Sequence, residues 1–114
     1  MATQLNMQLD VAGQPYPVPP AVATAITAVG REAVTNLNKH ARVGPHTVTL
    51  LFEPDTVVLE LVNAVTPAGR DGLSDTGAGV GLRGMRTRMA EVGGLLTAGP
   101  SGARWSLRAE WRRA

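Results

Sequence analysis

The segment Arg31–Ala41 reads R-E-A-V-T-N-L-N-K-H-A, and the rest of the chain can be understood from it. Glu32, Asn36 and His40 recur in it at a spacing of four residues, which places them above one another on one face of a helix. Lys39 falls near the same stripe. A carboxylate, an amide, an ammonium and an imidazole on one helix face do not suit an apolar core. The pattern instead predicts a site that holds a metal ion and a phosphate chain.

The length and composition of the chain favour one globular domain, residues 1–114. The sequence has 114 residues, of which 44% are hydrophobic, and this is enough to bury a core. The net charge of +2 gives no sign of a non-specific nucleic-acid binder. The absence of cysteine excludes disulfides and thiolate metal sites. No apolar run approaches the roughly 20 residues that a membrane-spanning helix needs, so we expect a cytoplasmic domain whose parent protein could still be membrane-anchored.

The helix that carries the polar stripe is expected to run from about Pro20 to Arg42. Pro19-Pro20 is typical of a helix start, and Gly44-Pro45 is typical of a helix end. The apolar positions repeat at intervals of three and four residues, as in a core-facing stripe: Val22, Ile26, Val29, Ala33 and Leu37. The polar stripe lies about 100° from the apolar one and should border a cleft.

Strands are expected on both sides of this helix. Residues 4–11 alternate strictly and predict a half-buried strand, with four apolar residues on one face: Leu5, Met7, Leu9 and Val11. Two strands follow the helix, Thr47–Phe52 and Thr56–Val62, and the second is apolar almost throughout, which favours a central position. Residues 64–78 then form a long loop, of a length that is often functional in compact domains.

The C-terminal third predicts one more helix and two more strands. The helix should contain an apolar stripe and end at Gly93-Gly94; the stripe consists of Leu82, Met85, Met89 and Val92. Strands are expected at Leu95–Ala98 and Ala103–Trp111, joined by a turn over residues 99–102. The order β-α-β-β-loop-α-β-β predicts an α+β two-layer sandwich, a mixed sheet with helices packed on one face.

Gly79, Gly81 and Gly84 fit the pattern G-x-G-x-x-G. A dinucleotide fold needs a strand directly before this pattern and an acidic residue about 20 positions later. Here a long loop precedes it, and the residue near that distance is Arg104, so we do not expect a dinucleotide site. Glycines that open a helix still leave backbone N–H groups at its positive end, and these suit phosphate.

Taken together, residues 31–41 resemble the N-box of sensor histidine kinases, and Gly79–Met85 resembles their second glycine box. The run G-L-R-G-M-R-T-R-M followed by V-G-G is similar to the subfamily with a small, short-lid ATP-binding domain. The resemblance extends from about Pro19 to Trp111. It implies the Bergerat ATP-binding fold of the GHKL superfamily, shared with chaperone, topoisomerase and mismatch-repair ATPases.

The resemblance also implies a role for each matching residue. Asn36 is expected to bind Mg²⁺ through its side-chain oxygen, and Glu32 to orient a metal-bound water or to act as a base toward the phosphoacceptor. The residues expected to bind ATP are Lys39, His40, Asn63, Gly77, Gly79, Gly81, Leu82 and Gly84. The implied reaction transfers the γ-phosphoryl group of ATP to a histidine on a separate dimerisation domain, for relay to a response regulator.

Three positions depart from the family pattern. Asn63 stands where the adenine-reading residue is usually Asp, Val65 where the first glycine box has glycine, and Ala103 where a threonine often occurs. An amide can accept a hydrogen bond from the adenine amino group and donate one to N1. We therefore expect adenine recognition that is retained but weaker or altered.

No histidine in the chain has the context of a phosphoacceptor on a dimerisation helix. We therefore expect a monomeric catalytic domain of a larger sensor, which does not phosphorylate itself. Two alternatives remain open: an anti-sigma-type serine kinase of the same fold, and a degenerate, non-catalytic nucleotide-binding or interaction domain.

Overall fold

A computed structural model describes residues 7–40, 46–64, 77–101 and 104–113; at residues 7–8, 36–40, 46, 64, 77–80 and 101 the description covers the backbone alone. The elements follow one another as β1 Met7–Gly13, α1 Pro20–His40, β2 His46–Phe52, β3 Thr56–Ala64, α3 Gly77–Ala90, β4 Leu95–Ser101 and β5 Arg104–Arg112. None of the helices in these ranges is long and apolar enough to cross a membrane.

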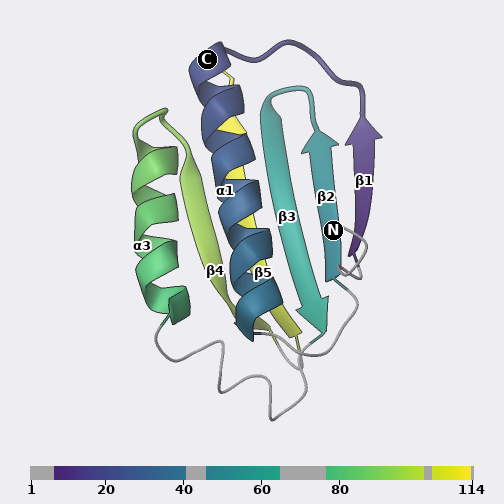
Figure 1. Cartoon of the computed structure of the whole chain (residues 1–114). Coiled ribbons are helices and arrows are strands. Elements are labelled where there is room, and N and C mark those ends of the chain that lie inside the picture. The colour runs from purple at the N-terminus through teal and green to yellow at the C-terminus, as the bar shows by residue number, and fades with distance from the viewer. Residues whose placement is uncertain (1–6, 41–45, 65–76, 102–103, 114) are drawn as a thin grey trace.

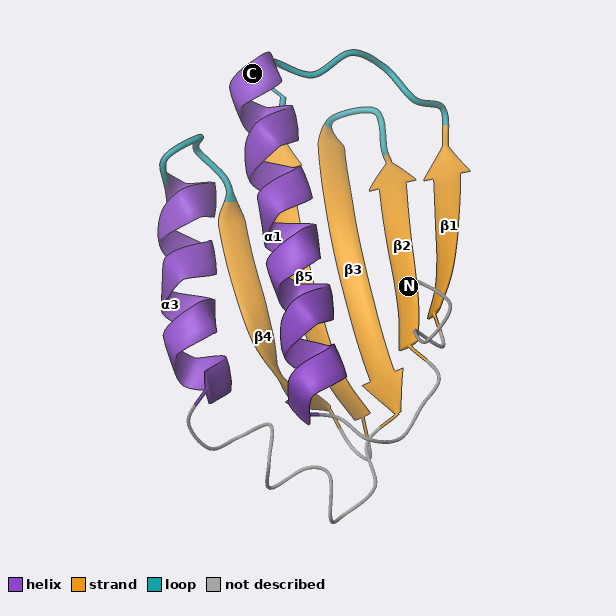
Figure 2. Cartoon of the chain, in the orientation of Figure 1, coloured by secondary structure: helices purple, strands orange, loops and turns teal. Residues whose placement is uncertain are grey.

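The strands form one mixed sheet in the order β1-β2-β3-β5-β4. β1 runs parallel to β2, and every other neighbouring pair is antiparallel. β3 lies in the middle of the sheet, as its nearly continuous apolar sequence predicted. Both helices lie on the same face of the sheet (Figures 1 and 2). The predicted α+β two-layer architecture is therefore confirmed.

The core lies between this face of the sheet and the two helices. The apolar stripe predicted for α1 is confirmed for its first four members, and the side chain of Leu37 lies outside the described part of the chain. Met85 and Met89 of α3 are buried against it, as are Leu61 and Leu107 of the sheet, and all four have at most 2% of their surface exposed. Burial of this apolar surface stabilises the packing of helices on the sheet.

Gly30 allows α1 to approach β3 closely. A Cβ atom added at Gly30 would lie 3.3 Å from Leu59 Cδ2, which is tighter than most real contacts of this kind. Glycine in a helix interior costs up to about 1 kcal/mol relative to alanine. Here that cost is offset by the close fit of the helix on the central strand.

The prediction of a half-buried first strand was wrong for its described residues. Leu9 and Val11 of β1 have 65% and 56% of their surface exposed. The helix layer covers β3, β5 and β4 and leaves the β1 edge of the sheet bare (Figure 2). The strand alternates because one of its faces continues the apolar face of the sheet, but no described helix packs on it. Leu5 lies outside the described residues.

The structure also shifts several predicted boundaries. β3 continues through Asn63 to Ala64, past its predicted end at Val62. β4 continues to Ser101, so that the expected turn residues Gly99 and Pro100 pair instead with β5. Proline is compatible with this position because β4 is an edge strand, where one side of the backbone needs no partner. Most of the predicted loop, residues 65–76, lies outside the described residues.

The end of α3 is the one predicted. Gly93 has a positive φ of 80°, and the N–H of Gly94 donates to the carbonyl of Met89 at 2.8 Å. The N–H of Gly93 donates to the carbonyl of Ala90 at 3.0 Å, which completes a Schellman motif. The helix begins at Gly77, so the last two residues of the predicted loop, 77 and 78, already belong to it.

Candidate functional site

Three element ends meet at one edge of the domain. β3 ends there at Ala64, α1 ends there at His40, and α3 begins there at Gly77 (Figure 1). These ends carry the sequence motifs singled out above, although some forty residues separate the first motif from the last. The topology alone therefore gathers the N-box and the glycine box at a common edge.

Asn63 is the residue of this edge that the structure describes most fully. It is the last residue but one of β3 and has 0% of its surface exposed. It pairs in register with His46 of β2 and with Trp105 of β5. Leu61, two residues earlier on the same face of the strand, belongs to the apolar core. The amide therefore lies at the rim of the core, next to the end of the strand.

The Asn63 amide has no hydrogen-bond partner among the described residues. Neither Oδ1 nor Nδ2 is paired, and Asn63 is the one polar side chain that is buried in the described part of the chain. A buried polar group left unpaired costs about 1–3 kcal/mol. Such groups are rare in native proteins, and a ligand that pairs with them is one explanation. A ligand that offers one donor and one acceptor side by side would satisfy both atoms.

The N-box residues lie along the C-terminal half of α1. Glu32 is exposed. The backbone of Asn36, Lys39 and His40 is helical, so the predicted four-residue spacing does fall on a helix, but their side chains lie outside the described part. The carbonyl end of a helix favours positive charge, and Lys39 stands in the last turn of α1.

The glycine box forms the first turns of α3, as expected for glycines that open a helix. Gly77 and Gly79 lie in the first turn, where the backbone N–H groups have no partner within the helix. Gly81 and Gly84 lie deeper, where an N–H group normally donates to the carbonyl four residues earlier. The free N–H groups that suit phosphate are therefore those of the first turn.

Leu82 and Gly84 differ in their surroundings. Leu82 is half-buried and packs against the core. A Cβ atom at Gly84 would meet nothing within 4 Å, so the packing of the described residues does not require glycine there. Val65 and Ala103, the other positions where the sequence departs from the kinase pattern, lie outside the described residues.

No group of three or more His, Cys, Asp or Glu side chains that could hold a metal ion occurs within the described ranges. The expected Mg²⁺ ligand, Asn36, has its side chain outside them. The structure therefore leaves the metal prediction untested.

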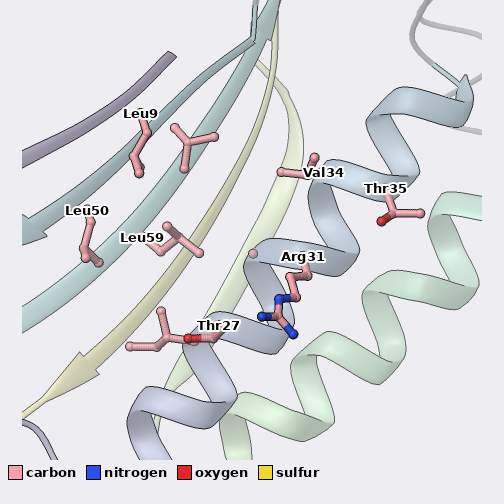
Figure 3. Close-up of a pocket in the computed structure, with 10 residues that line it drawn as sticks. Leu9, Thr27, Arg31, Val34, Thr35, Leu50 and Leu59 are labelled. Carbon is pink, nitrogen blue, oxygen red and sulfur yellow. The ribbon is translucent and has the colours of Figure 1, made fainter. Parts of the chain in front are cut away.

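A separate apolar groove lies between α1 and the strands β1, β2 and β3. It has a volume of about 540 Å³ and is lined by Leu9, Ile26, Thr27, Gly30, Arg31, Val34, Thr35, Val48, Leu50 and Leu59. Figure 3 shows Leu9, Leu50 and Leu59 reaching from the strands toward α1, and Val34 pointing back toward them. None of the predicted site residues lines this groove.

Sequence reasoning did not predict the groove. Its sequence signal was the apolar face of the first strand together with Gly30, which thins the helix at this point. The sequence pattern could not show whether a helix covers the apolar face of the first strand, because this depends on how the helices pack on the sheet.

The fold is similar to that of several solved structures. The Acinetobacter baumannii histidine kinase AdeS matches 97% of the chain with a TM-score of 0.72 and 13% identity. The catalytic domain of the histidine kinase ThkA, in a nucleotide-free form, matches 98% of the chain with a TM-score of 0.67 and 15% identity. This is the fold of histidine kinase catalytic domains. No protein-family model matches the sequence.

A third match with this fold is the histidine kinase domain of a blue-light activated histidine kinase, EL346 from Erythrobacter litoralis, with a TM-score of 0.63 and 18% identity over 92% of the chain. The chain spans 56% of the AdeS structure and 54% of the EL346 structure, but 82% of the ThkA catalytic domain. Its extent is thus close to that of the catalytic part alone.

Proposed function

We propose that this chain is the ATP-binding catalytic domain of a sensor histidine kinase. The observation that carries the proposal is the buried amide of Asn63, which has no partner among the described residues. It lies at the edge where α1 ends and α3 begins, in a domain with the histidine kinase catalytic fold. An adenine base presents an amino donor and a ring-nitrogen acceptor on adjacent atoms, and the amide can pair with both.

The remaining parts of ATP would follow the same edge. The free N–H groups at the start of α3, at Gly77 and Gly79, would donate hydrogen bonds to phosphate oxygens. The positive end of the helix favours the negative charge of the phosphates. Lys39 and His40 would contribute from α1. Asn36 would hold Mg²⁺ through its amide oxygen, and the ion, when bound, would neutralise charge on the phosphates.

The proposed reaction is phosphoryl transfer to a histidine of a separate dimerisation domain. The ring nitrogen of that histidine forms a bond to the γ-phosphorus, the bond from phosphorus to the β,γ-bridging oxygen breaks, and ADP leaves. Glu32 is exposed on α1, one helical turn before Asn36, so a carboxylate there could reach an incoming domain and orient or accept the proton of its histidine. A response regulator would receive the phosphoryl group afterwards, and the supply of ATP places the domain in the cytoplasm.

Calorimetric titration with a non-hydrolysable ATP analogue, with and without Mg²⁺, tests nucleotide binding. Wild type should bind, and Asn36→Ala should lose at least about tenfold in affinity in the presence of Mg²⁺. Thr35→Ala is the matched control, because Thr35 is the preceding residue of α1, is exposed and lines the apolar groove instead. If wild type did not bind the analogue, the proposal would fail, and the alternative of a degenerate, non-catalytic interaction domain would remain.

Labelling with γ-phosphate-labelled ATP tests the reaction. The chain alone should not label itself at His40 or His46. Addition of a histidine kinase dimerisation domain should give acid-labile phosphohistidine on that domain, whereas acid-stable phosphoserine on a protein substrate would favour the serine kinase alternative. Self-labelling at a histidine would contradict the proposal that the phosphoacceptor histidine lies on a separate domain.

A further inference from the structure

No hydrogen bond from a described residue fixes the orientation of the Asn63 amide. Both Oδ1 and Nδ2 lack a partner among the described residues, and the side chain has no exposed surface. An asparagine amide can turn by half a rotation about its last side-chain bond, which exchanges the positions of its oxygen and nitrogen at almost unchanged shape. Among the described residues, no hydrogen bond opposes this exchange.

The two orientations fit two kinds of purine edge. A 6-aminopurine such as adenine presents an amino donor at position 6 and an acceptor at N1. A 6-oxopurine such as hypoxanthine or guanine presents the reverse, an acceptor at position 6 and an N–H donor at N1. The amide can form two hydrogen bonds with either edge, with its oxygen and nitrogen exchanged.

A carboxylate at the same place would form only one hydrogen bond with either base. An ionised carboxylate only accepts hydrogen bonds, so it would pair with the 6-amino group of a 6-aminopurine or with the N1–H group of a 6-oxopurine. In both cases its other oxygen would face an acceptor of the base, and a buried acceptor left unpaired is costly. The amide of Asn63 avoids this cost with both bases.

We propose that Asn63 makes the nucleotide site tolerant of 6-oxopurine triphosphates as well as ATP. This inference rests on the proposed ATP-binding function and names the class of base that the site accepts. Inosine triphosphate is the matched probe, since it replaces the 6-amino group of ATP by an oxygen, converts N1 into a donor and is otherwise the same molecule.

The test is a titration of wild type and of Asn63→Asp with ATP and with inosine triphosphate, each with Mg²⁺. In wild type the two dissociation constants should agree within about tenfold, because both bases form the same number of hydrogen bonds. In Asn63→Asp both dissociation constants should rise by about tenfold, because the carboxylate leaves one acceptor of either base unpaired. Thermal unfolding of both proteins checks that the variant is folded.

The outcomes separate this inference from the proposed function. If wild type binds neither nucleotide, the proposed function fails and the inference fails with it. If wild type binds ATP and rejects inosine triphosphate by more than about hundredfold, the proposed function stands and the inference is overturned. The same holds if folded Asn63→Asp binds both nucleotides as tightly as wild type. The wild-type ratio is decisive by itself, so the test does not depend on the variant being stable.

Discussion

Asn63 at the end of β3 and Leu9 on β1 depart from ordinary burial in opposite directions. Asn63 is a polar residue with 0% of its surface exposed and no described partner, and Leu9 is an apolar residue with 65% exposed. Both belong to the same sheet, on either side of β2. The helix layer covers the middle of the sheet and stops short of β1 (Figure 2).

The difference between these regions shows where the domain gives up stability. A buried polar group is unusual in a folded protein and calls for an explanation, as does a large exposed apolar patch. A single exposed leucine is ordinary and needs none. The buried amide lowers the stability of the fold in the absence of a partner, whereas the exposed leucine only lacks the stabilisation that burial would give. The Asn63 edge is therefore the stronger functional candidate.

The largest effect is expected from truncating a leucine under the helix layer. Leu61→Ala, at a side chain with 1% exposure, should lower the free energy of unfolding by about 2–5 kcal/mol through lost burial and a residual cavity. Leu9→Ala should change it by less than about 0.5 kcal/mol. Urea denaturation measures both. If the two variants lost equal stability, the β1 face would be covered in solution, and the bare edge of the sheet would not exist there.

Replacing the buried amide by an apolar side chain of similar size should separate folding from binding. Asn63→Leu should raise the free energy of unfolding by about 1–3 kcal/mol, because it removes two unpaired polar atoms. The same change should weaken ATP binding at least about hundredfold. Denaturation and calorimetry provide the two readouts, with exposed Thr97→Ala of β4 as the control. A destabilised Asn63→Leu that still binds ATP would assign the amide a purely structural role.

A glycine in the middle of α3 and a glycine just after this helix should respond with opposite signs. Gly94→Ala should destabilise the fold by about 1–3 kcal/mol, because its Cβ would lie 2.7 Å from Met89 Cε and 2.8 Å from the Glu110 carbonyl oxygen. Gly84→Ala should stabilise α3 by up to about 1 kcal/mol, since nothing obstructs it.

The same Gly84→Ala variant tests the proposed site. If the backbone of the glycine box approaches phosphate, an added methyl group should reduce ATP affinity several-fold although the protein is more stable. Unchanged affinity in calorimetry would remove Gly84 from the site and leave the first turn of α3 as the phosphate contact.

The smallest effect is expected at the edge opposite the candidate site. There the Arg113 guanidinium lies 4.1 Å from the centre of the Tyr16 ring and donates to the Pro54 carbonyl at 3.1 Å. Arg113→Ala should cost about 0.5–1 kcal/mol of stability, as exposed cation–π contacts do. Nucleotide affinity should not change, and a measurable loss of binding would mean that the two edges are coupled.

Much of this architecture follows from local sequence pattern. The three- and four-residue spacing of Val22, Ile26, Val29 and Ala33 predicted both a helix and its buried face, because that period matches one turn of a helix. The apolar run of β3 predicted its central position, and Gly93-Gly94 predicted the end of α3, since glycine accepts the positive φ observed there.

Other features depended on neighbours that are distant in sequence. The alternation of β1 showed which residues share a face but not that the helices leave this face bare. The sequence at 99–101 is typical of a turn, yet pairing with β5 keeps it in the edge strand. Likewise, the glycines from Gly77 onward have low helix propensity, and they nevertheless form the first turns of α3, where Leu82 and Met85 pack on the core.

Local periodicity and side-chain chemistry were enough to predict the order of elements, the buried face of α1 and the types of residue available for a site. The packing of distant segments brings the ends of α1, β3 and α3 to one edge and encloses Asn63 there without a described partner. Burial depends on contacts between segments far apart in the chain, and no local pattern carries that information.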